Sequence, residues 1–60
     1  MYIIVTTARR GRVAYLAEGK GLDVTPERRA AARFPTRECA GARLSELKSQ
    51  RPAAWMQREA

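Results

Sequence analysis

The first run of hydrophobic residues in this chain is short and consists of side chains that favour β-strands. Residues 2–7 read Tyr-Ile-Ile-Val-Thr-Thr and are aromatic or β-branched throughout. Alternation along such a strand places Ile3 and Val5 on one face and Ile4 on the other. Because both faces are largely apolar, the pattern is typical of a central strand.

A second, weaker strand follows a polar turn that ends at Gly11, where glycine tolerates a positive φ. Within residues 12–18, Val13 and Tyr15 recur at alternate positions. The two runs therefore predict an antiparallel β-hairpin over residues 2–18.

A helix-start signal comes after the hairpin. Thr25 precedes Pro26 and an acidic residue, which predicts an N-cap and a short helix over residues 25–33. Pro35 disfavours helical geometry at Phe34. A short third strand or an extended link is therefore expected to carry Phe34 into the core.

The main helix is predicted over residues 36–50. Thr36 provides its N-cap, and an acidic residue follows in the first turn. Ala40, Leu44 and Leu47 fall at i, i+4 and i+7, which makes one apolar stripe. This helix is expected to cover one face of the hairpin.

The last part of the chain has no strong periodicity. Pro52 ends the main helix near residue 50, and residues 53–60 are expected to form a short helical or frayed tail. The elements combine into one α+β domain over residues 1–60, in the order β-β-α-(β)-α, with the strand near Phe34 in parentheses. The predicted core consists of apolar side chains of the hairpin, the link and the main helix: Ile3, Val5, Val13, Leu16, Phe34, Ala40, Leu44 and Leu47, with Tyr15 left open.

Composition excludes most of the chemistry that a small domain can perform. The 60 residues include no histidine and a single cysteine, Cys39. Histidine is the commonest general base and metal ligand, and one cysteine forms neither a structural zinc site nor a disulfide within its own chain. Cys39 adjoins the apolar stripe and is expected to be a buried small hydrophobe. The six acidic residues are scattered, so we expect no enzyme, no metal site and no cofactor.

Charge and hydropathy limit the classes of partner and the cellular location that we expect. Twelve Lys and Arg oppose six Asp and Glu, which gives a net charge of +6, and ten of the twelve cations are Arg. Arginine suits bidentate contacts with phosphate or carboxylate, so the expected partner is nucleic acid or an acidic protein surface. No apolar stretch approaches the roughly 20 residues of a membrane span, and a lone cysteine suits a reducing compartment, so a cytoplasmic protein is expected. The small core also leaves room for a homodimer.

The candidate partner-binding residues are basic side chains in two clusters and one tryptophan: Arg9, Arg10, Arg12, Arg29, Arg33, Arg37 and Trp55. The first cluster, at the hairpin tip, has two interpretations. It binds phosphates or an acidic groove, or it is a solvated turn whose charges protect the sheet edge from pairing with other strands. The second cluster, around the short helix, either forms a basic stripe or pairs within the chain with Glu27 and Glu38. Trp55 is either an interface anchor or a cover for the small core.

The stretch from Thr25 to Ala40, Thr-Pro-Glu-Arg-Arg-Ala-Ala-Ala-Arg-Phe-Pro-Thr-Arg-Glu-Cys-Ala, resembles a phrase common in small phage and mobile-element proteins. There a capped short helix ends in Ala, a Phe follows, and Thr or Ser caps an acidic helix start. A Tyr/Ile/Val-rich hairpin with a Tyr-Leu pair, here at Tyr15, usually precedes it. The resemblance covers about residues 2–47 and implies no catalytic residues.

Proteins of this size and kind include the anti-CRISPR proteins, so the resemblance implies a non-catalytic inhibitor that binds a host interference complex. Many members are acidic DNA mimics, whereas this chain is basic. The resemblance therefore implies docking on an acidic patch of a Cas subunit or on exposed guide RNA. Two other functions stay open: a small basic nucleic-acid-binding protein or regulator, and a homo-oligomeric structural or assembly subunit closed by the Trp55 tail.

Overall fold

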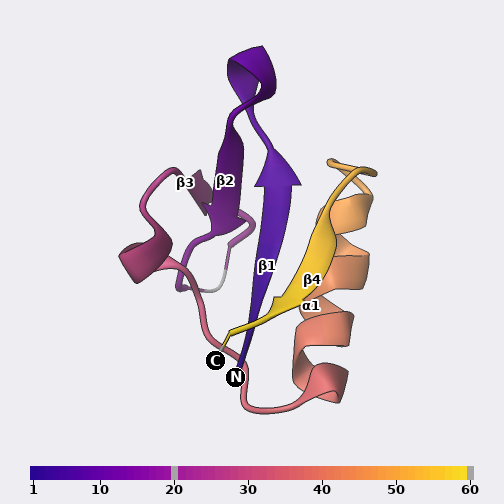
Figure 1. The fold of residues 1–60 in the computed structure, drawn as a ribbon. Helices are drawn as coiled ribbons and strands as arrows, with labels where there is room; N and C mark the ends of the chain where they lie inside the picture. The colour runs from indigo at the N-terminus through magenta and orange to yellow at the C-terminus, as the bar shows by residue number, and fades with distance from the viewer. Residues whose placement is uncertain (20, 60) are drawn as a thin grey trace.

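Four strands form an antiparallel sheet, and one α-helix packs against one of its faces (Figure 1). The computed structural model describes residues 1–19 and 21–59. Its strands are β1 (Tyr2–Thr7), β2 (Val13–Leu16), β3 (Val24–Thr25) and β4 (Trp55–Arg58), in the sheet order β3-β2-β1-β4. Its helices are α1 (Arg37–Lys48) and two 3-10 turns, η1 (Arg9–Gly11) and η2 (Arg28–Ala30). The predicted α+β fold, with an N-terminal hairpin and one main helix, is confirmed.

The hairpin forms as predicted, and β1 is the central strand of the sheet. Val5 of β1 lies opposite Tyr15 of β2 on one side and opposite Trp55 of β4 on the other. The side chains from Ile3 to Thr6 are all buried. Burial of both faces explains why this strand is apolar at consecutive positions.

The two faces of β1 contribute to separate core clusters. Ile4 packs with Leu16 of β2 and Leu47 of α1, beneath the helix. Ile3 and Val5 belong to a second cluster on the opposite face. The predicted core omits Ile4, although its side chain is fully buried. A core predicted beneath a single helix includes only one face of β1, although this strand is buried on both faces.

Predictions about individual core residues have mixed outcomes. Ala40 is fully buried, whereas Phe34 and Leu44 are partly buried and pack at the margin of the helix-side cluster. Val13 was expected in the core, and that prediction is wrong because 44% of its surface is exposed. Val13 pairs with Thr7 at the far end of the hairpin, on the sheet face opposite α1, where no helix covers it.

The main helix begins and ends close to its predicted limits. The Thr36 side chain accepts a hydrogen bond from the Cys39 backbone N–H at 3.2 Å, which caps the first turn. Ala40 and Leu47 are buried along one side of the helix. Cys39 is exposed, which contradicts its predicted burial. Its position one residue before Ala40 turns it about 100° away from the buried stripe.

The helix predicted over residues 25–33 does not form. Thr25 lies in β3 and pairs with Tyr15, and its side chain accepts a hydrogen bond from the Glu27 N–H at 3.1 Å. Only the three residues of η2 are helical, and Ala31 then takes an extended conformation with φ −68° and ψ 142°. Ala31 is fully buried against Ile3 and Val5. Packing of a small side chain against the sheet therefore overrides the local helix signal.

The link around Phe34 is extended, as one of the two predicted alternatives stated. Its backbone exchanges two hydrogen bonds with Tyr2, at 2.8 and 2.9 Å. This is an isolated bridge rather than a strand. The third strand of the sheet is formed instead by Val24–Thr25, although Thr25 was predicted as the N-cap of a helix.

The C-terminal segment is a strand and not the predicted helical or frayed tail. β4 pairs antiparallel with β1 from Val5–Trp55 to Tyr2–Arg58. The ladder continues to Glu59, because the Glu59 N–H donates to the Met1 carbonyl at 2.7 Å. The two termini consequently lie side by side (Figure 1). A central strand needs two partners, and β4 supplies the second one.

Candidate binding surface

The sheet face opposite α1 carries exposed aromatic and aliphatic side chains. Directly opposed residues of paired strands project to the same face. Trp55 and Tyr15 both lie opposite Val5, and Val13 lies opposite Thr7, two residues further along β1. We call Val13, Tyr15 and Trp55 the aromatic face.

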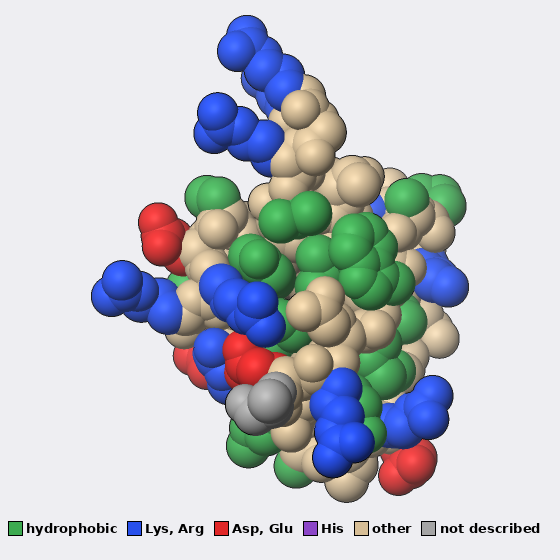
Figure 2. Space-filling model, in the orientation of Figure 1, with side chains coloured by type: hydrophobic (Ala, Val, Ile, Leu, Met, Phe, Trp, Pro, Cys, Tyr) green, Lys and Arg blue, Asp and Glu red, His purple; other side chains and the backbone are tan. Residues whose placement is uncertain are grey.

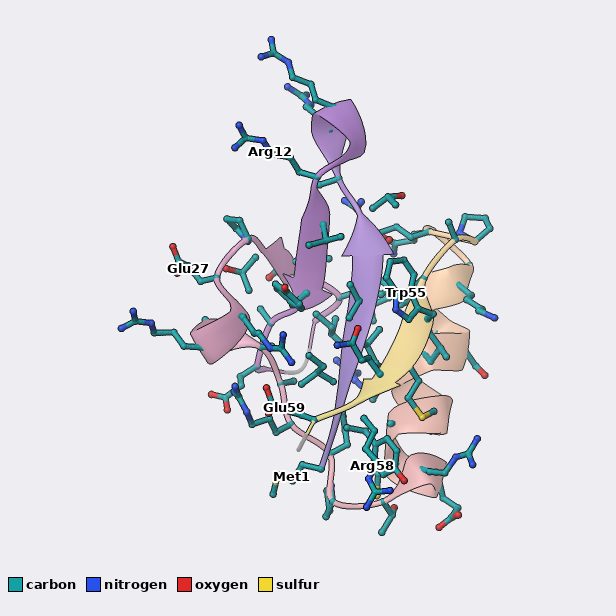
Figure 3. All side chains as sticks on the ribbon, in the orientation of Figure 1. Met1, Arg12, Glu27, Trp55, Arg58 and Glu59 are labelled. Carbon is teal, nitrogen blue, oxygen red and sulfur yellow. The ribbon has the colours of Figure 1, made fainter. Side chains whose placement is uncertain are left out.

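The aromatic face is accessible to a partner. Trp55 is 39% exposed, Val13 is 44% exposed and Tyr15 is partly exposed. In the view of Figure 2, hydrophobic side chains gather in the middle of the molecule, with basic side chains above and charged side chains below. Trp55 lies in front of the sheet in Figure 3. An exposed tryptophan beside other apolar side chains marks a region where a partner can displace water.

Buried side chains of the central strand lie on the same side of the sheet as this face. Val5 lies between Tyr15 and Trp55, Ile3 follows two residues away on that side, and both are at most 2% exposed. Ala31 packs against the same two side chains and is fully buried. The aromatic face is therefore held by paired strands on either side of a packed central strand and not by a loop, which lowers the entropy lost when a partner binds.

The hairpin tip projects beyond the rest of the molecule (Figure 1), and three arginines lie on it. Arg9, Arg10 and Arg12 are all exposed, and Arg12 points outward from the hairpin (Figure 3). Arg10 has φ 60° and ψ 31°, and Gly11 follows with φ 73°. The turn closes through a hydrogen bond from the Ala8 N–H to the Arg12 carbonyl at 2.5 Å. The tip arginines therefore adjoin the Val13 end of the aromatic face.

Arginines of a second basic cluster form ion pairs with Glu59. Arg33 Nε lies 2.7 Å from Glu59 Oε1, and Arg28 Nε lies 3.3 Å from Glu59 Oε2. Arg33 also donates to the Ala31 carbonyl at 3.0 Å. The hydrogen bond from Arg33 is the main cause that holds the pKa of Glu59 below its ordinary value of 4.5; partial desolvation opposes it, and Arg28 adds to it. Arg33 thus joins the η2 segment to the end of β4.

The predicted second cluster is not brought together as one stripe. Within the described residues, the acid that pairs with this cluster is Glu59 and not Glu27 or Glu38. Arg29 and Arg33 share no helix face, since the chain is extended after η2 and Arg33 instead bonds the Arg29 carbonyl at 3.3 Å. Arg29 is exposed on η2.

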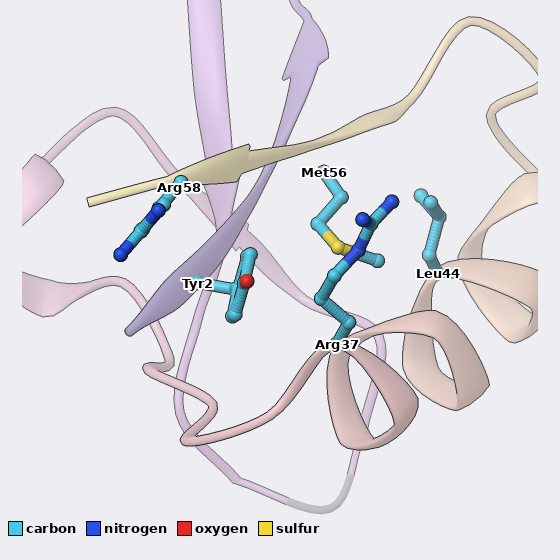
Figure 4. A pocket seen from close by; sticks show the side chains of 5 residues that line it. All are labelled: Tyr2, Arg37, Leu44, Met56 and Arg58. Atoms are coloured by element: carbon cyan, nitrogen blue, oxygen red, sulfur yellow. The ribbon is translucent and has the colours of Figure 1, made fainter.

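Arg37 lies elsewhere, in a hollow between α1 and β4 (Figure 4). The hollow has a volume of about 500 Å³ and is lined by Tyr2, Arg37, Leu44, Met56 and Arg58. Tyr2, Met56 and Arg58 share the helix-side face of the sheet, because their register partners alternate with those of the aromatic face. Sequence reasoning missed Arg58, because residues 53–60 were taken as a tail. Treating residues 55–58 as an alternating strand would have placed Met56 and Arg58 on one face.

Among residues 1–19 and 21–59, no group of three or more His, Cys, Asp or Glu side chains is placed to hold a metal ion. Within the same ranges, no helix has both the length and the apolar character needed to cross a membrane. Comparison of the chain with protein-family models, curated proteins and solved structures found no match.

Proposed function

We propose that this chain is a non-catalytic protein-binding module that docks through the aromatic face and the hairpin-tip arginines on an acidic protein surface. The observation that carries the proposal is the exposure of Trp55 and Val13 on a packed sheet face that α1 leaves uncovered. The tip arginines border this face and supply charge for an acidic partner.

The composition of the surface supports a protein partner. Interfaces between proteins combine an apolar centre with a polar rim, and tryptophan, tyrosine and arginine are enriched among their energetically important residues. Here Trp55, Tyr15 and Val13 form the centre, and arginines from the tip form part of the rim. The net charge of +6 favours encounter with an acidic partner and disfavours pairing of two copies through this face.

Direct binding of nucleic acid is the competing function. A platform for single strands combines stacking aromatics with a positive groove that follows the backbone. Arg28 and Arg33, at the other end of the sheet from the tip, are engaged by Glu59. Beside the aromatic face, positive charge is therefore concentrated at the hairpin tip and does not continue along the face, which favours a protein partner.

The sequence resemblance suggests a concrete partner class. An inhibitor of a CRISPR interference complex would use such a surface to cover an acidic patch of a Cas subunit and so block target recognition. The first titrations accordingly use purified interference complexes of several types, with labelled protein and with duplex DNA, single-stranded DNA and RNA as separate ligands.

Three forms of the protein make the test specific. Trp55→Ala removes the apolar anchor, Arg10→Gln with Arg12→Gln removes tip charge, and Lys48→Ala removes one charge from the exposed end of α1 as a control. We expect binding to a protein complex that weakens at least about tenfold in the first two forms and is unchanged in the third. Tight binding to free nucleic acid that Trp55→Ala abolishes would instead establish the competing function.

A further inference from the structure

The outer edge of β4 offers a free strand edge. Met1 and Glu59 exchange backbone hydrogen bonds at 2.7 and 3.5 Å, so they form a bonded pair of the β1–β4 ladder. Bonded pairs alternate along an antiparallel ladder. Gln57 and Trp55 therefore direct their backbone groups toward β1, while Met56 and Arg58 direct theirs outward. The sheet order ends at β4, so no further strand takes up these groups within the described residues.

The hollow between α1 and β4 opens beside this edge (Figure 4). Leu44, Met56 and the ring of Tyr2 give it an apolar lining. Arg37 and Arg58 add two exposed guanidinium groups. Within residues 1–19 and 21–59 neither guanidinium forms an ion pair with a carboxylate or a hydrogen bond. Figure 4 shows the Tyr2 ring between the two side chains, so Arg37 and Arg58 flank the hollow from opposite sides and attract a carboxylate that enters it.

We infer that β4 binds an extended acidic segment of a partner protein as a fifth strand, with a glutamate or aspartate side chain in the hollow between Arg37 and Arg58. A strand added at a sheet edge gains main-chain hydrogen bonds, and its alternate side chains enter pockets beside the edge. Residues of the segment that bond Met56 and Arg58 project their side chains to the same face as these two residues. That face carries the hollow, so backbone pairing and the carboxylate contact belong to one binding mode.

A second copy of this chain does not fit the same edge. Pairing of two β4 strands about Gln57 would place Arg58 of one copy beside Met56 of the other. The Arg37 and Arg58 side chains of both copies would then gather in one region with no acid among the lining residues. Like charges on paired strands destabilise the pairing, and charged residues on edge strands commonly prevent self-association.

This inference rests on the edge of β4 and on the helix-side hollow, not on the aromatic face. It can fail while the proposed function stands, because the two sites use different side chains. A partner that fits both would lay its acidic strand along β4 and cover Trp55 on the opposite face of the same strand.

The probe is a fluorescent peptide of about six residues, the usual length of a strand, in which Glu alternates with Val. Its matched control carries Gln in place of every Glu. NMR titration of the isotope-labelled protein gives the dissociation constant and the binding site. We expect hydrogen exchange of the Met56 and Arg58 amides to slow on binding, while the Gln57 amide, which already bonds β1, is unchanged.

Two sets of variants separate the charge contact from strand pairing. Arg37→Gln with Arg58→Gln is expected to weaken binding of the Glu peptide by about tenfold or more. Arg29→Gln with Lys48→Gln changes the same charge away from both proposed sites and is expected to leave the affinity unchanged. N-methylation of the Glu backbone amides is expected to abolish binding, whereas N-methylation of the Val amides, which face away from β4, is expected to be tolerated.

Several results would overturn the inference. Equal affinity for the Glu and Gln peptides would remove the role of the two arginines. Equal effects of the two N-methylated peptides, or binding of N-acetylglutamate amide as tightly as the Glu peptide, would remove strand pairing. Displacement of the peptide by single-stranded DNA that binds Arg37 and Arg58 more tightly would assign the site to nucleic acid.

Discussion

Two glycines occupy opposite backbone environments, and alanine at each is expected to change stability in opposite directions. Gly11 has φ +73°, and a Cβ there would meet nothing within 4 Å, so the cost of alanine lies in the backbone alone. We expect Gly11→Ala to lower the free energy of unfolding by about 1–2 kcal/mol. Gly41 lies in α1, where a Cβ would contact the Met56 methyl carbon at 3.9 Å. Gly41→Ala is expected to raise it by about 0.5–1 kcal/mol.

Urea unfolding of both variants beside the wild type measures this difference. Destabilisation by both substitutions would mean that α1 has no room beside Met56. A neutral Gly11→Ala would mean that the hairpin tip does not hold the left-handed turn described above.

Glu59 gives the stability of the fold a specific dependence on pH. Its pKa is lowered in the folded state, chiefly by the hydrogen bond from Arg33. The stabilisation is therefore fully present above the unfolded-state pKa and is lost as pH falls through the folded pKa. We expect wild type to be more stable than Glu59→Gln at neutral pH and this difference to disappear in acid. A difference in free energy of unfolding that stays constant over the same pH range would contradict the Arg33–Glu59 contact.

At the scale of elements, pairing of β4 with β1 can be tested with two proline substitutions in β4, one of which is a matched control. Gln57 and Arg58 are both exposed, but the Gln57 N–H faces β1 and the Arg58 N–H faces outward. Proline removes the N–H in each case. We expect Gln57→Pro to lower the free energy of unfolding by about 1–3 kcal/mol and Arg58→Pro to have a smaller effect. Equal and negligible effects on thermal unfolding would indicate a frayed tail.

Elements with strong local signals could be predicted from the sequence. The hairpin follows from a β-branched run and a glycine turn, and α1 follows from the Thr36 cap and the Pro52 stop. β3 and β4 are two and four residues long and are defined by pairing with β2 and β1, which no local pattern encodes. The incorrect prediction of a helix over residues 25–33 has the same origin. The tertiary contacts of Ala31 favour extended backbone over the local helix signal.

The candidate surface could be predicted only in part. Trp55 and the tip arginines were identified from residue type, and both lie at the surface. Val13 was assigned to the core because strand alternation does not show which face remains uncovered. Arg58 and Glu59 were missed because their positions matter only once β4 forms and brings the chain end beside Met1 and Arg33.

At the scale of the whole molecule, α1 covers one sheet face and leaves the other to a single extended segment. The face opposite α1 holds Trp55 and adjoins a tip with three arginines, and the hollow between α1 and β4 is lined by two more, Arg37 and Arg58. A net charge of +6 on a chain of 60 residues reinforces both sites for acidic partners. The two proposed binding surfaces therefore lie on the two faces of one edge strand.

Site-specific photo-crosslinking in cells tests the role of the aromatic face most directly. A photoreactive phenylalanine analogue is placed at Trp55, at Val13, or at Ser45 on the exposed side of α1 as a control. We predict the same discrete protein adduct from positions 55 and 13, absent from position 45 and lost when Arg10 and Arg12 are changed to Gln. Adducts that are identical at all three positions, or that contain nucleic acid in place of protein, would contradict the proposed protein-binding function.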